Sequence, residues 1–217
     1  MGPPSSGGLH VIQMLNILDN FNLKKIKHNS SEYINLLAET MKYAYADRSK
    51  YLGDPDFYNV PIKKVTSKKY ANEISNNIEI GKAASVEDIY PGKFIENESH
   101  ETTHFSVVDK NGNVVSMTYT LNSTFGSKVV IKGTGILMNN EMDDFSAAPG
   151  IPNQFNLLGA EANQIAPYKR PLSSMTPTIV LKNNELFFTT GSPGGARIIS
   201  AVLLSLIHIS EPTRRPK

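Results

Sequence analysis

The sequence predicts an α+β fold. Up to residue 77, apolar side chains recur at the spacing of three to four residues that is typical of helices. From residue 102 the pattern alternates between apolar and polar side chains, and asparagine or glycine turns separate the alternating runs. A last apolar run, after a glycine loop, returns to helical spacing. Helices and antiparallel strands that are segregated along a chain favour packed layers of each kind.

Three segments in the first part of the chain are expected to be helices. Leu9–Phe21 carries an apolar stripe, and the serine pair Ser5-Ser6 can cap its start. A longer helix is expected from Ser31 to about Arg48, because the turn signal Gly53-Asp54-Pro55 follows it. Residues 67–77 are expected to form a shorter helix.

The segment that follows, residues 81–101, is expected to be an exposed loop or linker. It contains Pro91-Gly92 and ends in a polar run from Glu96 to Glu101. Polar, exposed segments of this kind are the parts of a chain that are most readily cleaved.

Two hairpins are expected after this linker. Residues 105–109 and 114–121 alternate on either side of Asn111-Gly112, the strongest short hairpin signal. Residues 178–181 and 186–190 form a similar pair around Asn183-Asn184. Residues 139–176, between the hairpins, are rich in loop signals, and sites usually lie in such loops.

The composition describes a globular chain. Its 217 residues are enough for a sizeable core, and one domain is the default. Cysteine is absent, which excludes disulfides and thiolate catalysis. A net charge of +2 gives no basic patch for nucleic acid. The histidines lack ligand spacing and no apolar run could cross a bilayer, so we expect no metal, no cofactor and no transmembrane segment.

Thr102 is the leading candidate for chemistry, because it lies where the polar linker meets the first strand. If the bond before it were cut, one residue would carry both a nucleophilic hydroxyl and a free α-amine that can act as its base. Thr120 and Asn122 alternate toward the same side of the partner strand and could flank it. A threonine pair at the start of a strand is also common for structural reasons alone.

Three further segments could supply a binding site. The loop Gly191-Ser192-Pro193-Gly194-Gly195 precedes a helix expected from Ala196 to Leu203, so its N–H groups could hold developing negative charge. Glu141 and Asp144 could converge on a cation, and the hydroxyls of Ser173 and Ser174 on a carboxylate. Taken singly, each segment also fits an ordinary structural turn.

Taken together and in order, these segments resemble the gamma-glutamyltranspeptidase family, the glutathione hydrolases, which are N-terminal-nucleophile hydrolases. The resemblance extends from Pro3 to about Val202. It implies an α+β fold with four layers in the order αββα, incomplete in this chain. The motifs that carry it are Pro3–Gly8, Lys42–Arg48, Tyr51–Asp56, Thr102–Val107, Asn140–Phe145, Arg170–Pro177 and Gly191–Arg197.

The resemblance also implies a role for each candidate residue. Thr102 would be the nucleophile, freed by self-cleavage between Glu101 and Thr102, and Thr120 would orient it by a hydrogen bond. Gly194 and Gly195 would supply the N–H groups of the oxyanion hole. The remaining candidates would bind the donor: Asn122, Glu141 and Asp144 at its α-amine, Ser173 and Ser174 at its α-carboxylate, and Phe155 in a lid over the site.

The resemblance implies a gamma-glutamyltransferase or hydrolase without a cofactor. A gamma-glutamyl group from glutathione or a similar donor would form an ester on Thr102 and pass to water, an amino acid or a peptide. One alternative is a cephalosporin (glutaryl) acylase, although Glu141 and Asp144 favour a donor with an α-amine. The other is a catalytically inert homologue. Members of the family are usually exported, which implies a periplasmic or extracellular location.

The chain departs from the family pattern at both ends. The resemblance implies a longer precursor, with a signal peptide and a carboxylate-binding arginine upstream. Residues 1–101 would be the end of its large subunit and 102–203 the start of its small subunit. Residues 204–217 resemble a translated sequencing adapter and are expected to be a non-native tail. We expect this chain alone to fold poorly and show little activity, because sheet edges and apolar faces would be uncovered.

Overall fold

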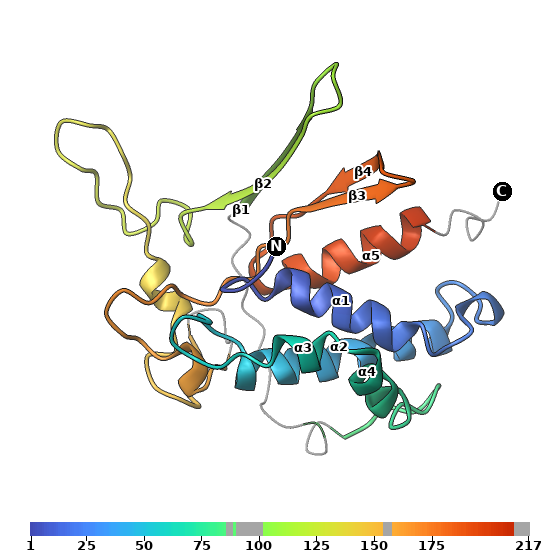
Figure 1. Ribbon diagram of the computed structural model, residues 1–217. Helices are drawn as coiled ribbons and strands as arrows, with labels where there is room; N and C mark the ends of the chain where they lie inside the picture. Colours follow the sequence, from blue (N-terminus) through green and yellow to red (C-terminus); the bar gives the residue numbers. More distant parts are fainter. Residues whose placement is uncertain (86–88, 90–101, 154–157, 211–217) are drawn as a thin grey trace.

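The computed structural model describes residues 1–85, 89, 102–153 and 158–210 (Figure 1). Within these residues helices and antiparallel strands are segregated, so the α+β prediction is confirmed. The regular elements are α1 (Gly7–Leu18), α2 (Ser31–Tyr51), α3 (Ile62–Val65), α4 (Lys68–Ser75), β1 (Thr102–Val108), β2 (Val114–Thr120), β3 (Thr178–Lys182), β4 (Glu185–Thr190) and α5 (Ile198–Ser210). Short 3-10 turns, η1 (Leu23–Lys25), η2 (Glu141–Asp144), η3 (Glu161–Asn163) and η4 (Gly195–Arg197), lie between them.

The core lies where α1 meets α2, α4 and α5. Met14 and Ile17 of α1 are fully buried there, as is Leu36 of α2. α5 contributes Ile199 and Val202 to the same cluster. In Figure 1 the β3–β4 hairpin covers α5, which lies beside α1 above the α2–α4 layer. The layers are therefore held together mainly by apolar burial around α1.

α5 is longer than the sequence predicted. Its helix continues beyond Leu203 to Ser210, so part of the segment expected to be a non-native tail is helical. Leu206 and Ile207 are buried there and belong to the core cluster around α1. In the part of the chain that the structure describes, no helix is long and apolar enough to span a membrane.

The serine pair before α1 has a different role from the one predicted. Ser6 occupies the N-cap position, but its side chain makes no capping hydrogen bond, so the prediction was wrong for Ser6. The Ser5 hydroxyl accepts a long hydrogen bond, 3.4 Å, from the N–H of Gly7, the first residue of α1. The Ser6 hydroxyl instead donates to the carbonyl of Ser173 at 2.8 Å, and the Ser5 hydroxyl to that of Met175 at 2.6 Å. Both hydroxyls thus donate to carbonyl groups of a distant loop, and these bonds hold that loop against the start of α1. α2, in contrast, is capped by Ser30, whose hydroxyl accepts from an N–H of the first turn.

Both predicted hairpins are present. β1 and β2 pair in register from Thr102 opposite Thr120 to Val108 opposite Val114. β3 and β4 turn through Asn183 and Asn184, both at positive φ, as a tight two-residue hairpin requires. The two hairpins meet through polar side chains, including the hydroxyls of Ser106 and Thr189 at 3.1 Å.

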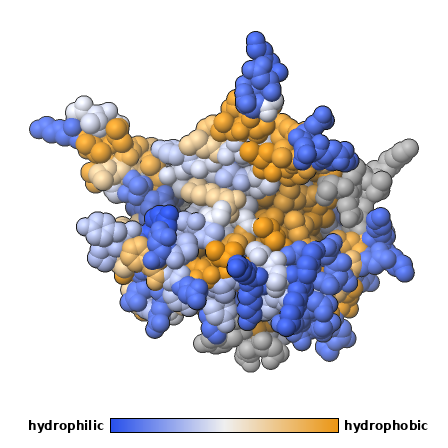
Figure 2. All heavy atoms as spheres, in the orientation of Figure 1, coloured by the Kyte–Doolittle hydropathy of each residue, from blue (hydrophilic) through white to orange (hydrophobic). Residues whose placement is uncertain are grey.

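The opposite face of the β1–β2 hairpin is apolar and exposed. Phe105 pairs with Met117 and Val107 with Val115, and each of these side chains is about half exposed. Figure 2 shows the apolar surface along this hairpin, below its hydrophilic tip. Within the described residues no helix covers this face, so the layered fold is incomplete on this side, as the resemblance implied.

An ion pair joins the turn after α2 to the loop that precedes Ser173 and Ser174. The Arg170 guanidinium donates to Asp54 through Nε at 2.8 Å and through Nη2 at 2.5 Å, and the Arg170 N–H donates to Asp54 at 2.9 Å. Asp54 is fully buried, and its hydrogen bonds with Arg170 hold the pKa of this carboxyl well below its usual range. This interaction links segments on either side of Thr102.

We expect Asp54→Asn to lower the free energy of unfolding of the full-length protein by about 2 kcal/mol, because charged hydrogen bonds to Arg170 are lost. The contribution is present above the ordinary carboxyl pKa of about 4 and is lost as pH falls through the lower folded value. Denaturant unfolding at neutral and acidic pH would measure both effects. Asp56→Asn is the matched control, because Asp56 is exposed. Equal stability of the two variants would contradict the expectation.

Candidate active site

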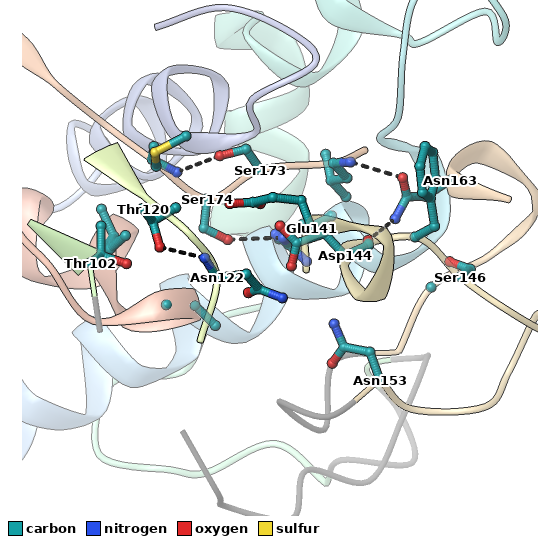
Figure 3. Close-up of a pocket in the computed structure, with 18 of the residues that line it drawn as sticks. Thr102, Thr120, Asn122, Glu141, Asp144, Ser146, Asn153, Asn163, Ser173 and Ser174 are labelled. Carbon is teal, nitrogen blue, oxygen red and sulfur yellow. Dashed lines mark hydrogen bonds between the residues drawn. The ribbon is translucent and has the colours of Figure 1, made fainter. Parts of the chain in front are cut away.

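A cavity opens where four segments meet (Figure 3): the start of β1, the acidic turn η2, the loop that carries Ser173 and Ser174 (the serine loop), and the start of α5. It holds about 700 Å³ of empty space, a volume that includes open solvent at its mouth. Glu101 and Phe155, predicted as the cleavage position and the lid residue, lie outside the described residues. The predicted site residues that line the cavity are Thr102, Thr120, Asn122, Glu141, Asp144, Ser173, Ser174 and Gly195.

Thr102 is the first residue of β1 and is half-buried at the cavity. Thr120 is directly opposite it in the strand register, and both side chains line the cavity. The Thr120 hydroxyl accepts a hydrogen bond from the N–H of Asn122 at 2.9 Å, which orients its oxygen. The pairing places two hydroxyls side by side, while the predicted hydrogen bond between them stays a prediction.

Asn122 leaves the strand in a left-handed conformation, with φ of 74°. Asparagine tolerates this region better than most residues. Its side chain is buried and donates to the carbonyl of Asn140 at 3.2 Å, and the Asn140 side chain in turn bonds Ser123 at 3.0 Å. These bonds fix the end of β2 against the residue that precedes the acidic turn.

Glu141 and Asp144 are the two ends of the turn η2, and their carboxyl groups share a hydrogen bond. Burial and the neighbouring Glu141 carboxyl raise the pKa of Asp144 to about 8. Burial also raises the pKa of Glu141. The pair therefore shares one proton near neutral pH, and a ligand cation would favour its loss.

Asn163 was not singled out from the sequence, yet it ties the acidic turn to the serine loop. Its side chain is buried, donates to the carbonyl of Asp144 at 2.7 Å and accepts from the N–H of Leu172 at 2.9 Å. One amide thus sets the separation between the carboxyl pair and Ser173. Its short polar context, Glu161-Ala162-Asn163-Gln164, gives no local signal of this role.

Ser173 and Ser174 approach the cavity on a loop held by the N-terminal turn. The Ser6 N–H donates to the carbonyl of Ser173 at 2.9 Å, and Gly7 allows the close approach. A Cβ on Gly7 would lie 2.0 Å from the Thr176 hydroxyl. The Ser173 hydroxyl accepts from the N–H of Met175 at 3.0 Å, which leaves its own proton available to donate.

Gly194 and Gly195 both have positive φ, 122° and 53°, which favours glycine. Gly195 lines the cavity, whereas Gly194 lies directly before it in the loop that leads into α5. Gly191, at the start of this loop, packs on His104 so closely that a Cβ there would lie 2.1 Å from the ring. This contact fixes the glycine loop relative to β1, the strand that begins at Thr102.

The arrangement combines a hydroxyl at a strand start, an acidic pair on one wall and hydroxyl donors on another (Figure 3). An amino-acid-like group carries an ammonium and a carboxylate on one carbon, and these walls offer partners for both. N–H groups near a helix start can hold the negative charge of an acyl-transfer intermediate. The cavity can therefore bind such a group and present an acyl carbon to Thr102.

Comparisons with known proteins support this geometry. A family model described as gamma-glutamyltranspeptidase matches residues 1–217. A glutathione hydrolase proenzyme of Escherichia coli is 53% identical over 100% of this chain and 39% of its own length. The acylase ACY 1 proenzyme of a Pseudomonas species is 39% identical over 95% of this chain and 35% of its own length. The chain thus spans about two fifths of the length of the E. coli relative.

Solved structures agree with these matches. A Helicobacter pylori gamma-glutamyltranspeptidase T380A mutant aligns with a TM-score of 0.50 and 56% identity, over 51% of this chain and 60% of that one. A cephalosporin acylase from Bacillus halodurans aligns with a TM-score of 0.74 over 97% of this chain and 35% of that one. At 24% identity, the second alignment shows a shared fold alone.

We expect a ligand that places an ammonium group beside the carboxyl pair to release about one proton when it binds near pH 7, because the ammonium favours the doubly ionised pair. Since the pKa of Asp144 is raised to about 8, affinity should rise as pH increases toward that value. Calorimetric titration of the full-length protein with L-glutamate, in buffers of different ionisation enthalpy, measures the released proton.

Asp144→Asn should abolish this proton release and weaken binding. Asp143→Asn is the control, because Asp143 is in the same turn but does not line the cavity. Binding by the unmodified protein without proton release would contradict the shared-proton interpretation.

Proposed function

Because this chain belongs to the gamma-glutamyltranspeptidase family, we propose that the protein that carries it is an autoprocessed gamma-glutamyltransferase and glutathione hydrolase. The observation that carries the proposal is the convergence of Thr102, the acidic pair and the serine pair on one cavity. The name proenzyme, given to the E. coli relative, supports a precursor that is cleaved before it acts.

In the proposed mechanism, the Thr102 hydroxyl first attacks the carbonyl of Glu101. The peptide bond becomes an ester, its nitrogen becomes the free α-amine of Thr102, and water then hydrolyses the ester. The chain is now two subunits, and Thr102 carries its own base. The hydrogen-bonded links between residues before and after Thr102, described above, would keep the subunits together.

The donor would then bind between the two polar walls. Asn122, Glu141 and Asp144 would hold the α-amine of its glutamyl group, and Ser173 and Ser174 the α-carboxylate. The α-amine of Thr102 takes the hydroxyl proton as the oxygen attacks the γ-carbonyl, and returns it to the leaving amine. The product is a gamma-glutamyl ester on Thr102.

The N–H groups of Gly194 and Gly195 would stabilise the oxyanion that forms in each step. Loss of one such donor costs about 3 kcal/mol in comparable acyl transfers. Water, an amino acid or a peptide then attacks the ester and releases glutamate or a new gamma-glutamyl compound. Glutathione is proposed as a donor because the relatives are named for its hydrolysis.

An acylase function is the second candidate, because an acylase proenzyme is among the relatives. A glutaryl donor lacks the α-amine that the half-buried Glu141–Asp144 pair would bind, so the acidic wall favours a gamma-glutamyl donor. Comparison of gamma-glutamyl and glutaryl anilides as donors separates the two activities. An exported location, expected from the resemblance, belongs to the same proposal, and cell fractionation tests it.

We expect Thr102→Ala in the full-length protein to remain a single chain and to lose hydrolysis of gamma-glutamyl anilide, because both steps need the hydroxyl. Thr103→Ala is the matched control, since Thr103 is exposed on the opposite side of β1. Gel electrophoresis and mass spectrometry would show the cut, and anilide release would show turnover. A single uncut chain in the unmodified protein would favour the inert homologue.

A further inference from the structure

Arg48 is a buried cation that lines the cavity. It lies in α2, its residue is 5% exposed, and it lines the same cavity as the acidic turn. Within the described residues, no carboxylate lies within the 4.0 Å that defines a salt bridge with its guanidinium. A buried charge without an ion-pair partner is costly, so its retention calls for a function or a compensating ligand.

The guanidinium is held by two hydroxyl groups. Nε donates to the Ser6 hydroxyl at 3.1 Å, and Nη2 donates to the Ser174 hydroxyl at 2.9 Å. Ser6 is itself fixed, because its hydroxyl donates to the carbonyl of Ser173 at 2.8 Å. Arg48 therefore spans the N-terminal turn and the serine loop with a rigid planar group.

This contact decides what the Ser174 hydroxyl can do. A guanidinium only donates, so Ser174 accepts from Arg48 and its own proton must point elsewhere. Ser174 lies at the cavity beside the acidic turn (Figure 3). A hydroxyl that accepts from a cation is also polarised, which makes it a stronger donor to an anion in the cavity.

The part of the cavity at the acidic turn and the part at Arg48 carry charges of opposite sign. Asp144 and Glu141 offer negative charge to an ammonium group, and among the described residues that line the cavity Arg48 is the cation. The attraction between Arg48 and Asp144 acts through space, without a direct ion pair. A ligand carboxylate next to Ser174 would compensate the buried guanidinium.

We propose that Arg48 is a positioning residue for the α-carboxylate of the donor, holding Ser174 as a donor into the cavity and favouring an anionic group there. This inference rests on the proposed function and assigns a residue of the large-subunit side to donor selection. A merely structural Arg48 would tie α2 to the serine loop without distinguishing one donor from another.

The test compares two donors with the full-length protein: gamma-glutamyl p-nitroanilide, and 4-aminobutyryl p-nitroanilide, which lacks only the α-carboxylate. Arg48→Met should raise KM for the first donor by about 10- to 100-fold with little change in kcat. The kcat/KM of the second donor should stay within about twofold. Lys50→Met is the control, because Lys50 is exposed on the same helix.

Two further variants separate orientation from charge. Arg48→Lys keeps the charge but loses the planar fork that reaches both hydroxyls, so its KM should lie between those of the unmodified protein and Arg48→Met. Combining Arg48→Met with Ser174→Ala should cost less than the product of the single effects, because both remove the same interaction.

The outcomes distinguish this inference from the function on which it rests. Equal losses on both donors, or no loss on either, would overturn the role of Arg48. Absence of turnover by the unmodified protein would overturn the proposed function itself, and this inference with it. If Arg48→Met does not fold, Ser6→Ala removes the acceptor of Nε together with the Ser6 hydroxyl bond to Ser173, while the Ser6 N–H still holds the Ser173 carbonyl. It should give a smaller rise in KM for the carboxylate-bearing donor only, and equal effects on both donors would again overturn the inference.

Discussion

The docking of the serine loop on the N-terminal turn is the interaction on which the rest of the site depends. Ser6 binds the carbonyl of Ser173 through both its N–H and its hydroxyl, at 2.9 and 2.8 Å, and Gly7 leaves room for Thr176. Ser6 and Ser173 are 167 residues apart in the sequence. Their bonds hold polypeptide from before and after Thr102 together, so a cut at that position would not by itself separate the site.

Two further braces give this docking its accuracy. Arg170 closes the loop before Ser173 onto the buried carboxylate of Asp54, and Asn163 sets the distance from that loop to the acidic turn. Catalytic groups must be held to within a fraction of an ångström, and supporting hydrogen bonds of this kind supply that accuracy. The hairpins contribute less to it, because one face of β1–β2 has no cover within the described residues.

Local patterns were sufficient for the hairpins, the longer helices and the glycine loop, because turn residues and apolar spacing act over a few positions. They failed where tertiary contacts override a local option. Ser6 follows the capping pattern yet binds a distant carbonyl, and the helical residue Arg48 is buried where it contacts both the N-terminal turn and the serine loop. Asn163 left no signal, since a single amide bridging two loops has no period along the chain. Residues 204–210 continue α5, and Leu206 and Ile207 pack in the core, which residue composition alone did not reveal.

The empty cavity holds charges that a zwitterionic group would satisfy better than solvent. Desolvation and the closeness of the two carboxyl groups keep the acidic pair from ionising fully without a cation, and among the described residues the buried Arg48 has no carboxylate within salt-bridge distance. When no ammonium group is bound, a proton on the carboxyl pair takes its place. A donor without an α-amine would therefore meet a carboxyl pair that holds one proton, and not two ionised carboxylates. No comparable substitute exists for the carboxylate, because arginine does not lose its proton in proteins. Discrimination at the amine is therefore a competition with a proton and depends on pH, whereas discrimination at the carboxylate is fixed by a permanent charge.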